Sequence, residues 1–444
     1  MNVRGRIYFA YIGLRGSAIP RHYREYLKQD SVGPSPDTTR LLLARLLGHC
    51  RERVPHYASA LRDLPDPALD PDAVLQRMPV LTKRTLRERF DALTSTDLAG
   101  RRWYFNTSGG STGEPVRLIQ DEEFECRSAG LSLAFSRWAG QEVGQPEVRL
   151  WGSEQEVLSG TRGWRVRAAN ALTRTTFLNA FRMTPAAMRE FAKVLRRTRP
   201  RIIIAYAQAI YELAGFLESE ALDVAPVGAV ISSAGTLHDF MRARIARVFQ
   251  CPVYDRYGSR EVGLIAAERP GVEGKWVPPW NVVLEVVDEE GRRVPPGVDG
   301  EILVTSLGNM AMPLIRYRIG DRGALAPDPV RGGRVLTRLY GRNVDAFRQR
   351  DGTLVDGEYF THLVYFRDWV DKFQFVQTGY DEVVLRVVSR TKDHRSLQPE
   401  IEQISARTKA ALGHGTVLRV EWVDEIPPAS SGKYRYTISQ VTPR

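Results

Sequence analysis

The feature that most constrains the fold is an alternation of short apolar runs with amphipathic segments between Glu147 and Gly258. The runs "RIIIAY" and "GAVISSAG" are rich in β-branched residues and short enough to be buried strands. The stretches between the runs have helical spacing, and "TPAAMREFAKVLRRTRP" begins with Thr184 as a cap and Pro185 in its first turn. Strands that alternate with helices predict a largely parallel α/β layer.

The pattern changes on both sides of this region. Residues 37–63 read as a helix with leucines near helical spacing, and residues 78–90 read as a short extended piece followed by a helix that Thr82 caps. After Arg269 the chain reads as antiparallel strands joined by Gly/Pro turns. From about Val344 it holds two strands, a helix and a third strand, which is typical of a compact α+β unit.

We therefore expect an α/β protein of two domains. The larger one, over residues 1–341, contains mostly parallel sheets and a β-subdomain. The smaller one, over residues 342–444, is an α+β domain. A chain of 444 residues is long enough for this division.

Composition limits the partners and the compartment. The net charge of +11 leaves two readings open, an anionic partner such as a nucleotide or coenzyme A, and a basic solvated surface. No basic run is interleaved with aromatic residues over enough length to indicate a nucleic-acid groove. Cys50, Cys126 and Cys251 are too widely separated for a metal-binding pair, so we expect a reduced, cytoplasmic compartment.

The longest apolar run that suggests a membrane element is "IYFAYIGL", Ile7–Leu14. It is far shorter than the roughly 20 residues of a spanning helix. Arginines flank it and no small-residue cleavage site follows, so we expect neither a transmembrane segment nor a signal peptide. A buried first strand or helix is the favoured reading, and a weak contact with a membrane surface is the alternative.

The first candidate for chemistry is the loop "NTSGGSTGEP", which lies between two strand-like segments, "RRWYF" and "VRLIQD". Consecutive small residues let backbone N–H groups surround a phosphate, and the hydroxyl groups add donors. Glu114 stands where a nucleotide-binding loop of the Gly-Lys-Ser/Thr type has lysine, so the loop is not of that type. A plain turn is the alternative.

Two carboxylates form the next candidates. Glu261, in "YDRYGSREVG", follows a strand at the predicted carboxyl edge of the sheet, where it can hold Mg²⁺ beside phosphates. Tyr257 in the same motif can stack on a base. Asp321, in "YRIGD", stands in an expected Gly-Asp turn and can accept bonds from sugar hydroxyls. The alternatives are a salt bridge for Glu261 and a simple turn residue for Asp321.

Two cations complete the set. Arg342, in "YGRNVD", lies at the expected domain junction and can bind a phosphate with two parallel hydrogen bonds. Lys433, in "PPASSGKYRY", lies in a polar loop and can deliver one positive charge to a transition state. The alternative for Arg342 is a position in a hinge, and Lys433 taken alone is better read as an exposed surface lysine.

These five motifs, in this order, resemble those of the adenylate-forming superfamily, and most of all its phenylacetate–CoA ligase branch with the CapK proteins and coenzyme F390 synthetases. The segments "VPHYASAL" and "MPVLTKRTLRE" also resemble this branch. The resemblance covers residues from about 40 to 440. It implies a ligase in which ATP and a carboxylic acid give an acyl-adenylate and pyrophosphate, and a nucleophile then displaces AMP. It also implies that the small domain is a mobile lid.

The resemblance assigns a role to each motif. Lys433 and Glu261 are the expected catalytic residues, with Glu261 also the expected Mg²⁺ ligand. The residues expected to bind ATP are Thr107, Ser108, Gly109, Gly110, Ser111, Thr112, Gly113, Ser233, Ala234, Gly235, Tyr257, Gly258, Asp321 and Arg342. The residues expected to line the acid pocket are Trp151, Tyr206, Gln208 and Thr236.

The chain departs from the family's pattern in three places. Asn343 and Val344 replace a usual carboxylate of the hinge motif, so the hinge residue stays open. Arg269 and Lys275 occupy a region where relatives often carry Cys and His, so we expect no zinc. The segment "SSAG" lacks an acidic residue that many relatives carry in the adenine pocket.

The acceptor and the assembly stay open. Coenzyme A would give a thioester and an amine would give an amide. The alternatives in other classes are AMP transfer to a small molecule, as in F390 synthetase, and a non-catalytic nucleotide-binding relative. We expect no nucleic-acid partner, and a homodimer is left open.

Overall fold

The computed structural model describes residues 2–33, 36–107, 116–151, 164–180, 183–327, 333–340, 347–351, 353–355, 357–364, 367, 369–426 and 436–441. These residues form two compact units, one that reaches to Leu339 and one that begins at Tyr340. The predicted domain boundary, between residues 341 and 342, lies outside the described residues and stays a prediction. The mixed α/β architecture agrees with the expected fold class.

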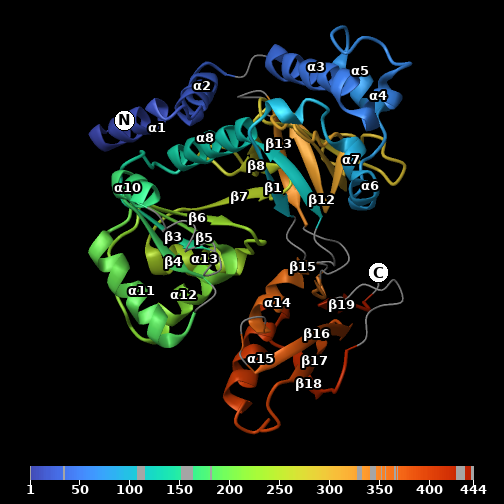
Figure 1. Ribbon diagram of the computed structural model, residues 1–444. Coiled ribbons are helices and arrows are strands. Elements are labelled where there is room, and N and C mark those ends of the chain that lie inside the picture. Colours follow the sequence, from blue (N-terminus) through green and yellow to red (C-terminus); the bar gives the residue numbers. More distant parts are fainter. Residues whose placement is uncertain are drawn as a thin grey trace. The chain divides into compact units, whose positions relative to one another are not determined.

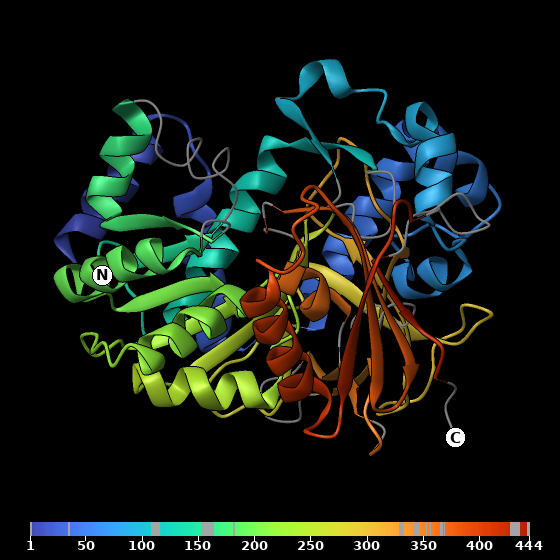
Figure 2. The same ribbon diagram turned by 90° about the horizontal axis from the view of Figure 1, so that it is seen from below.

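One half of the large sheet is parallel, as the alternation of apolar runs predicts. Its order is β4-β3-β5-β6-β7. The strands are β3 (Glu147–Trp151), β4 (Thr175–Asn179), β5 (Ile202–Tyr206), β6 (Ala229–Ser233) and β7 (Val253–Ser259). The connecting helices are α10 (Trp164–Thr173), α11 (Pro185–Thr198), α12 (Ala207–Ser219) and α13 (Asp239–Phe249). Thr184 caps α11 as expected, because its side chain accepts a hydrogen bond from the Ala187 amide. Figures 1 and 2 show α11, α12 and α13 together on one face of these strands.

The other half of the sheet is antiparallel and continues from the same β7. Its order is β7-β8-β9-β13-β12-β11-β10. The strands are β8 (Gly263–Ala267), β9 (Lys275–Val277), β10 (Val282–Val287), β11 (Gly300–Ser306), β12 (Tyr317–Pro327) and β13 (Arg334–Leu339). Asp255 still pairs with Ser232 of β6, whereas Arg256 already pairs with Ala267 of β8. The strand therefore changes partners between two successive residues, and this change joins the two halves.

The N-terminal third of the chain is helical apart from one hairpin. The helices are α1 (Val3–Leu14), α2 (Ile19–Val32), α3 (Pro36–Arg53), α4 (Pro55–Leu61), α5 (Pro71–Arg77), α6 (Lys83–Glu88), α7 (Phe90–Leu93), the 3₁₀ turn η1 (Leu98–Gly100) and α8 (Glu122–Trp138). The hairpin consists of β1 (Trp103–Thr107) and β2 (Arg117–Asp121). Thr82 caps α6 as predicted. The single helix expected over residues 37–63 is wrong, because the extended residue Val54 before Pro55 separates α3 from α4.

The apolar run at residues 7–14 forms part of α1 and is only half covered. Gly5 and Phe9 are buried, whereas Ile7 and Leu14 are 49% and 91% exposed. The favoured reading of a buried first element therefore holds for one face of the helix. No helix among the described residues has the length and apolar character needed to cross a membrane.

The second unit is an α+β arrangement around a four-stranded sheet. Its elements are β14 (Phe347–Arg348), β15 (Leu354–Val355), α14 (Gly357–Val364), β16 (Val370–Gly379), β17 (Glu382–Ser389), α15 (Gln398–Leu412), β18 (Val417–Trp422) and β19 (Thr437–Ser439). The sheet order is β18-β17-β16-β19, and Figure 2 shows α15 along one of its faces. The predicted strand, strand, helix and strand are β16, β17, α15 and β18, with β19 as an additional edge strand.

Candidate functional site

The hydroxyl-rich loop joins the two strands of the β1–β2 hairpin. Thr107 pairs with Arg117, so the chain leaves β1 and enters β2 at adjacent points. The Asn106 side-chain oxygen accepts a hydrogen bond of 2.8 Å from the Thr107 amide at the start of the loop. The expected position of the loop between two strands is therefore correct. Ser108, Gly109, Gly110, Ser111, Thr112 and Gly113 lie outside the described residues.

A buried glutamine fastens this hairpin to the turn that carries Glu261. The Gln120 amide nitrogen donates to the carbonyl oxygens of Arg260 at 2.8 Å and Glu261 at 3.2 Å. Its oxygen accepts hydrogen bonds from the Asn106 amide at 2.8 Å and the Tyr104 hydroxyl at 3.2 Å. Gln120 therefore fixes the start of the loop beside the Glu261 turn, although Gln120 and Arg260 are 140 residues apart in sequence.

Glu261 itself is buried in the turn between β7 and β8, with 6% of its surface exposed. Its Oε1 atom accepts a hydrogen bond of 3.3 Å from the Tyr317 hydroxyl and lies 3.9 Å from the Lys83 ammonium nitrogen. The expected alternative of an ion pair is therefore partly realised, with a lysine rather than an arginine. A carboxylate that faces one cation at this distance keeps the ability to bind a second cation.

Sequence reasoning missed Lys83 and Gln120 as members of this site. Lys83 lies in "MPVLTKRTLRE", a segment that contributed only to the family resemblance. It is the first residue of α6, directly after the cap Thr82. Gln120 lies on β2, immediately before Asp121, and its alternating position on a strand carries no signal that its side chain is buried against a distant turn.

Tyr257 and Asp321, both expected to bind the nucleotide, contact each other. The Tyr257 hydroxyl donates a hydrogen bond of 2.6 Å to the Asp321 carboxylate. The expected Gly-Asp turn is wrong, because Asp321 lies inside strand β12. Gly320 has a φ of +100° there, and the pairing with β11 shifts register between Glu301 and Leu303, so an irregularity in the strand replaces the turn.

Gly258 follows Tyr257 for a steric reason. A Cβ atom at this position would lie 2.6 Å from the Gly263 carbonyl oxygen on the facing strand. Any other residue would force β7 and β8 apart at the base of the Glu261 turn. The glycine therefore serves the close approach of two strands, and the assignment of Gly258 to ATP binding stays a prediction.

The segment Ser233–Gly235 ends β6 at the carboxyl edge of the parallel strands. Ser233 is buried, and Ala234 has a φ of +51°, in the left-handed region that an L-residue with a Cβ atom rarely occupies. A strained residue of this kind at a strand end is a frequent feature of binding sites. Thr236 follows and is half-buried.

Two of the residues expected in the acid pocket contact each other. The rings of Trp151, the last residue of β3, and Tyr206, the last residue of β5, have centroids 4.3 Å apart. Gln208 is 8% exposed and donates a hydrogen bond of 3.0 Å to Glu212 on its own helix. Its oxygen atom is buried without a hydrogen-bond partner among the described residues.

The remaining predicted site residues cannot be placed. Arg342 and Lys433 lie outside the described residues, as do the hinge positions Asn343, Val344 and Asp345. Their roles stay predictions.

The region in which relatives carry Cys and His is occupied by ion pairs. Arg269 lies 2.6 Å from the Asp30 carboxylate, and Lys275 lies 3.0 Å from Asp255. Burial raises the pKa of the Asp255 carboxyl, and the Lys275 ammonium opposes that rise. Within the described ranges, no three His, Cys, Asp or Glu side chains gather as a metal site. The expectation of no zinc stays a prediction.

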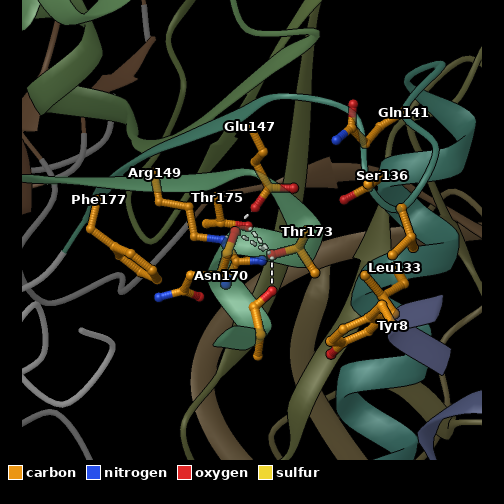
Figure 3. A pocket seen from close by; sticks show the side chains of 13 residues that line it. Tyr8, Leu133, Ser136, Gln141, Glu147, Arg149, Asn170, Thr173, Thr175 and Phe177 are labelled. Carbon is orange, nitrogen blue, oxygen red and sulfur yellow. Dashed lines mark hydrogen bonds and ion pairs between the residues drawn. The ribbon is translucent and has the colours of Figure 1, made fainter. Parts of the chain in front are cut away.

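A cavity of about 160 Å³ lies at the opposite edge of the parallel strands (Figure 3). Polar groups from the starts of β3 and β4 line it together with α1, α8 and α10. Glu147 and Arg149 form an ion pair of 2.5 Å in its wall. The acid pocket predicted at Trp151 and Tyr206 lies at the other end of β3, so this cavity is a different feature.

Two family models match parts of the chain. Residues 172–312 match the model described as AMP-binding enzyme, and residues 347–440 match the CapK C-terminal domain. The first range contains Ser233–Gly235, Tyr257 and Glu261. The second covers most of the second unit.

Whole-chain relatives agree with these models. Protein CapK of Staphylococcus aureus is 25% identical over 83% of this chain and 81% of its own length. Phenylacetate-coenzyme A ligase of Escherichia coli K12 is 24% identical over 87% of this chain and 90% of its own. A solved 2-hydroxyisobutyryl-CoA ligase in the postadenylation state, 19% identical, superposes with a TM-score of 0.61 over 93% of this chain and 90% of its own, which shows the shared fold.

The motifs, the partners that surround Glu261 and Asp321, the two family models and the relatives along most of the chain all point the same way. Along most of its length the chain is similar to the adenylate-forming enzymes of the branch that contains CapK and phenylacetate–CoA ligase.

Proposed function

We propose that this chain is an AMP-forming ligase that activates a carboxylic acid with ATP and passes the acyl group to coenzyme A or to an amine. The observation that carries the proposal is the convergence at the Glu261 turn. Gln120 holds the start of the glycine-rich loop against this turn, and Tyr257 reaches Asp321 from the strand that precedes it. A phosphate loop, a buried carboxylate and a ribose-binding carboxylate are the parts that an ATP site requires.

The nucleotide is held by groups from three strands. The loop from Thr107 to Gly113 surrounds the β- and γ-phosphates with backbone N–H groups and hydroxyls. Asp321 accepts hydrogen bonds from the ribose hydroxyls, and the Tyr257 hydroxyl at 2.6 Å orients that carboxylate. The Tyr257 ring stacks on adenine beside the backbone of Ser233–Gly235. Arg342 binds a phosphate or ribose oxygen.

Glu261 suits a magnesium ion shared with the phosphates. Mg²⁺ commonly takes one or two protein carboxylates and completes its shell with phosphate oxygens and water. Glu261 provides one buried carboxylate, and Lys83 at 3.9 Å is too distant to saturate it. The ion would neutralise phosphate charge, and Lys83 adds a second positive charge at the same place.

Two displacements make up the reaction. A carboxylate oxygen of the acid attacks the α-phosphorus, and the bond from that phosphorus to pyrophosphate breaks. In the second step the sulfur of coenzyme A, or the nitrogen of an amine, attacks the acyl carbon. AMP leaves with the electron pair of the broken bond, and the nucleophile loses its proton. Lys433 neutralises charge on the carboxylate and the α-phosphate in the first step.

The test is pyrophosphate release from Mg-ATP with pools of aryl, fatty, hydroxy and amino acids, with hydroxylamine as the trap for the acyl-adenylate. We expect acid-dependent release and hydroxamate formation. Lys433→Ala should lower the rate by roughly 10²–10³, the cost of one lost transition-state donor. Lys392→Ala, which removes an exposed lysine of the same unit, is the matched control and should keep the wild-type rate.

The acceptor is identified in the same assay. When coenzyme A replaces hydroxylamine, a thioester should accumulate, and an amine that competes with it would indicate an amide ligase. If ATP binds but no acid of any pool releases pyrophosphate, acid activation is contradicted for those acids. AMP that becomes attached to a small molecule in that case would instead establish nucleotidyl transfer.

A further inference from the structure

Among the described residues, the parallel half of the sheet has two arginines on one face, Arg149 and Arg256, and one carboxylate paired with them, Glu147. Arg149 of β3 is paired with Glu147 on the same strand at 2.5 Å. Arg256 of β7 has no ion pair with any described residue. Its contacts there are a hydrogen bond of 3.3 Å to the Ser132 hydroxyl and a position 5.6 Å from the Trp151 ring centroid.

Arg256 is also incompletely hydrogen-bonded. Its Nε atom is buried and has no partner among the described residues. Burial, with Arg149 as the next cause, lowers the pKa of Arg256 to about 10. Arg256 is half-buried, and its positive charge is unfavourable there because a desolvated guanidinium N–H group needs an acceptor.

Arg256 faces the side of the sheet where the acid is proposed to bind, not the side of the nucleotide. Successive side chains of a strand point to opposite faces, so Arg256 and Tyr257 face opposite ways. Tyr257 reaches Asp321, on the side where the nucleotide is proposed to bind. Arg256 lies over Trp151, whose ring contacts Tyr206, on the side where the acid is proposed to bind. It also stands where β7 leaves β6 for β8.

We propose that Arg256 makes the acid pocket select acids that carry a second anionic group besides the carboxylate that is activated. The second group, such as another carboxylate, pairs with the Arg256 guanidinium beside the Trp151–Tyr206 ring pair. It supplies the countercharge that the described residues do not provide. This inference rests on the proposed function only in naming the pocket as the acid site, because the binding preference itself does not require turnover.

Arg149 is the internal comparison for this assignment. Its guanidinium is turned toward Glu147 in the wall of the cavity of Figure 3 and lies 5.8 Å from the Phe177 ring. Its charge is therefore already balanced, and it needs no ligand. The two arginines thus have different roles although they lie on the same face.

The test uses pairs of acids that differ by one carboxylate: butyrate and succinate, valerate and glutarate, phenylacetate and 2-carboxyphenylacetate. Binding to the full chain without ATP is measured by calorimetry or by the shift in melting temperature. At least one dicarboxylate should bind better than its monocarboxylate partner. Arg256→Leu should reduce that preference by about 30-fold or more, because it removes one partner of a desolvated charge pair.

Three variants make the result specific. Arg256→Lys keeps the charge and should retain most of the preference, and Arg256→Met is a second neutral replacement should the leucine variant fold poorly. Arg292→Leu removes an exposed arginine elsewhere and should change nothing. The inference is overturned if no dicarboxylate binds better than its partner. It is also overturned if the neutral variants weaken both members of a pair equally, since Arg256 would then hold the carboxylate that reacts.

A hydroxylamine assay on the same panel separates this inference from the proposed function. Binding that prefers the dicarboxylate, with no hydroxamate formed, would support the role of Arg256 and contradict acid activation. Hydroxamate formation at equal rates from both members of each pair would support acid activation and contradict the role of Arg256.

Discussion

Each half of the large sheet packs against an arginine, and the surroundings of the two differ: Arg316 is buried, whereas Arg256 is half-buried with a buried Nε atom. In the antiparallel half, Arg316 donates to the Glu285 carboxylate at 3.2 Å and to the carbonyl oxygens of Met78 at 2.9 Å and Gly291 at 2.6 Å. In the parallel half, Arg256 has a serine hydroxyl and an aromatic ring. A buried charge with many hydrogen bonds holds structure together, whereas a half-buried charge with few hydrogen bonds is available to a ligand.

The two arginines also differ in backbone conformation and in the elements that their contacts connect. Arg316 has a φ of +47°, an unfavourable backbone conformation for a residue with a Cβ atom. Its amide donates to the Thr305 hydroxyl, and Glu285 is further bonded by Arg293. This network connects α5, β10 and β11 around one side chain. Arg256 connects no comparable set of elements.

The largest expected effect is the loss of stability when Arg316, which makes several hydrogen bonds, is replaced. Arg316→Met should lower the free energy of unfolding by about 3–5 kcal/mol, because it leaves Glu285 buried with one partner fewer and strands carbonyl groups. Chemical denaturation measures the change. Arg292→Met, at an exposed position, is the control and should leave the midpoint nearly unchanged. A loss below 1 kcal/mol for Arg316→Met would contradict the structural role.

Replacement of Gln120, a neutral side chain that also makes several hydrogen bonds, should lower stability less than replacement of Arg316. Gln120→Leu removes both bonds to the Glu261 turn and leaves two carbonyl oxygens without that donor, which should cost about 1–3 kcal/mol of stability. We also expect pyrophosphate release to fall, because the glycine-rich loop is no longer fastened beside Glu261. Normal turnover in a destabilised variant would show that Gln120 serves the fold alone.

Removal of the Tyr257 hydroxyl should weaken ATP binding more than it lowers the stability of the fold. Tyr257→Phe keeps the ring and loses the hydrogen bond of 2.6 Å to Asp321. We expect KM for ATP to rise by about tenfold with little change in kcat, since one hydrogen bond to a charged group contributes about 1.5 kcal/mol. An unchanged KM would mean that Asp321 does not need this hydroxyl for orientation.

A partly exposed carboxylate provides a pH-dependent test. The hydrogen bond from His22, with Arg21 nearby, lowers the pKa of Glu123 to about 2. Because the folded pKa lies below the usual value near 4.5, its stabilisation is complete above that pH and is lost as pH falls toward 2. The melting temperature of Glu123→Gln should therefore fall less than that of the wild type between pH 5 and 2.5. An equal fall in melting temperature for the wild type and Glu123→Gln over this pH range would contradict the stabilising role of Glu123.

The smallest expected effect is on the arginine proposed to bind the ligand. Arg256→Leu should not lower the free energy of unfolding by more than about 1 kcal/mol, because leucine avoids the cost of partly burying a charge that has no ion pair among the described residues. Denaturation beside Arg316→Met gives the direct contrast between the two arginines. A loss as large as that of Arg316→Met would show that Arg256 is structural and would end the comparison.

The local pattern of residues determined much of this architecture. Alternating apolar runs predicted the parallel strands, and Thr82 and Thr184 predicted two helix starts, because caps and periodicity act within a few residues. The same pattern placed Glu261 at a strand end and the hydroxyl-rich loop between two strands. The five motifs then indicated the family before any contact was known.

Only the tertiary structure decided which residues meet. Lys83 approaches Glu261, and Gln120 bonds to the same turn, across separations of more than 100 residues. The strand position of Asp321 came from a register shift that two paired strands impose together. Arg316 and Arg256 are both arginines that lie next to a tyrosine of a motif, and nothing local distinguishes them. The Glu285 carboxylate, which comes from another strand, pairs with Arg316. Only the packing of the sheet shows that no carboxylate of the described residues forms an ion pair with Arg256.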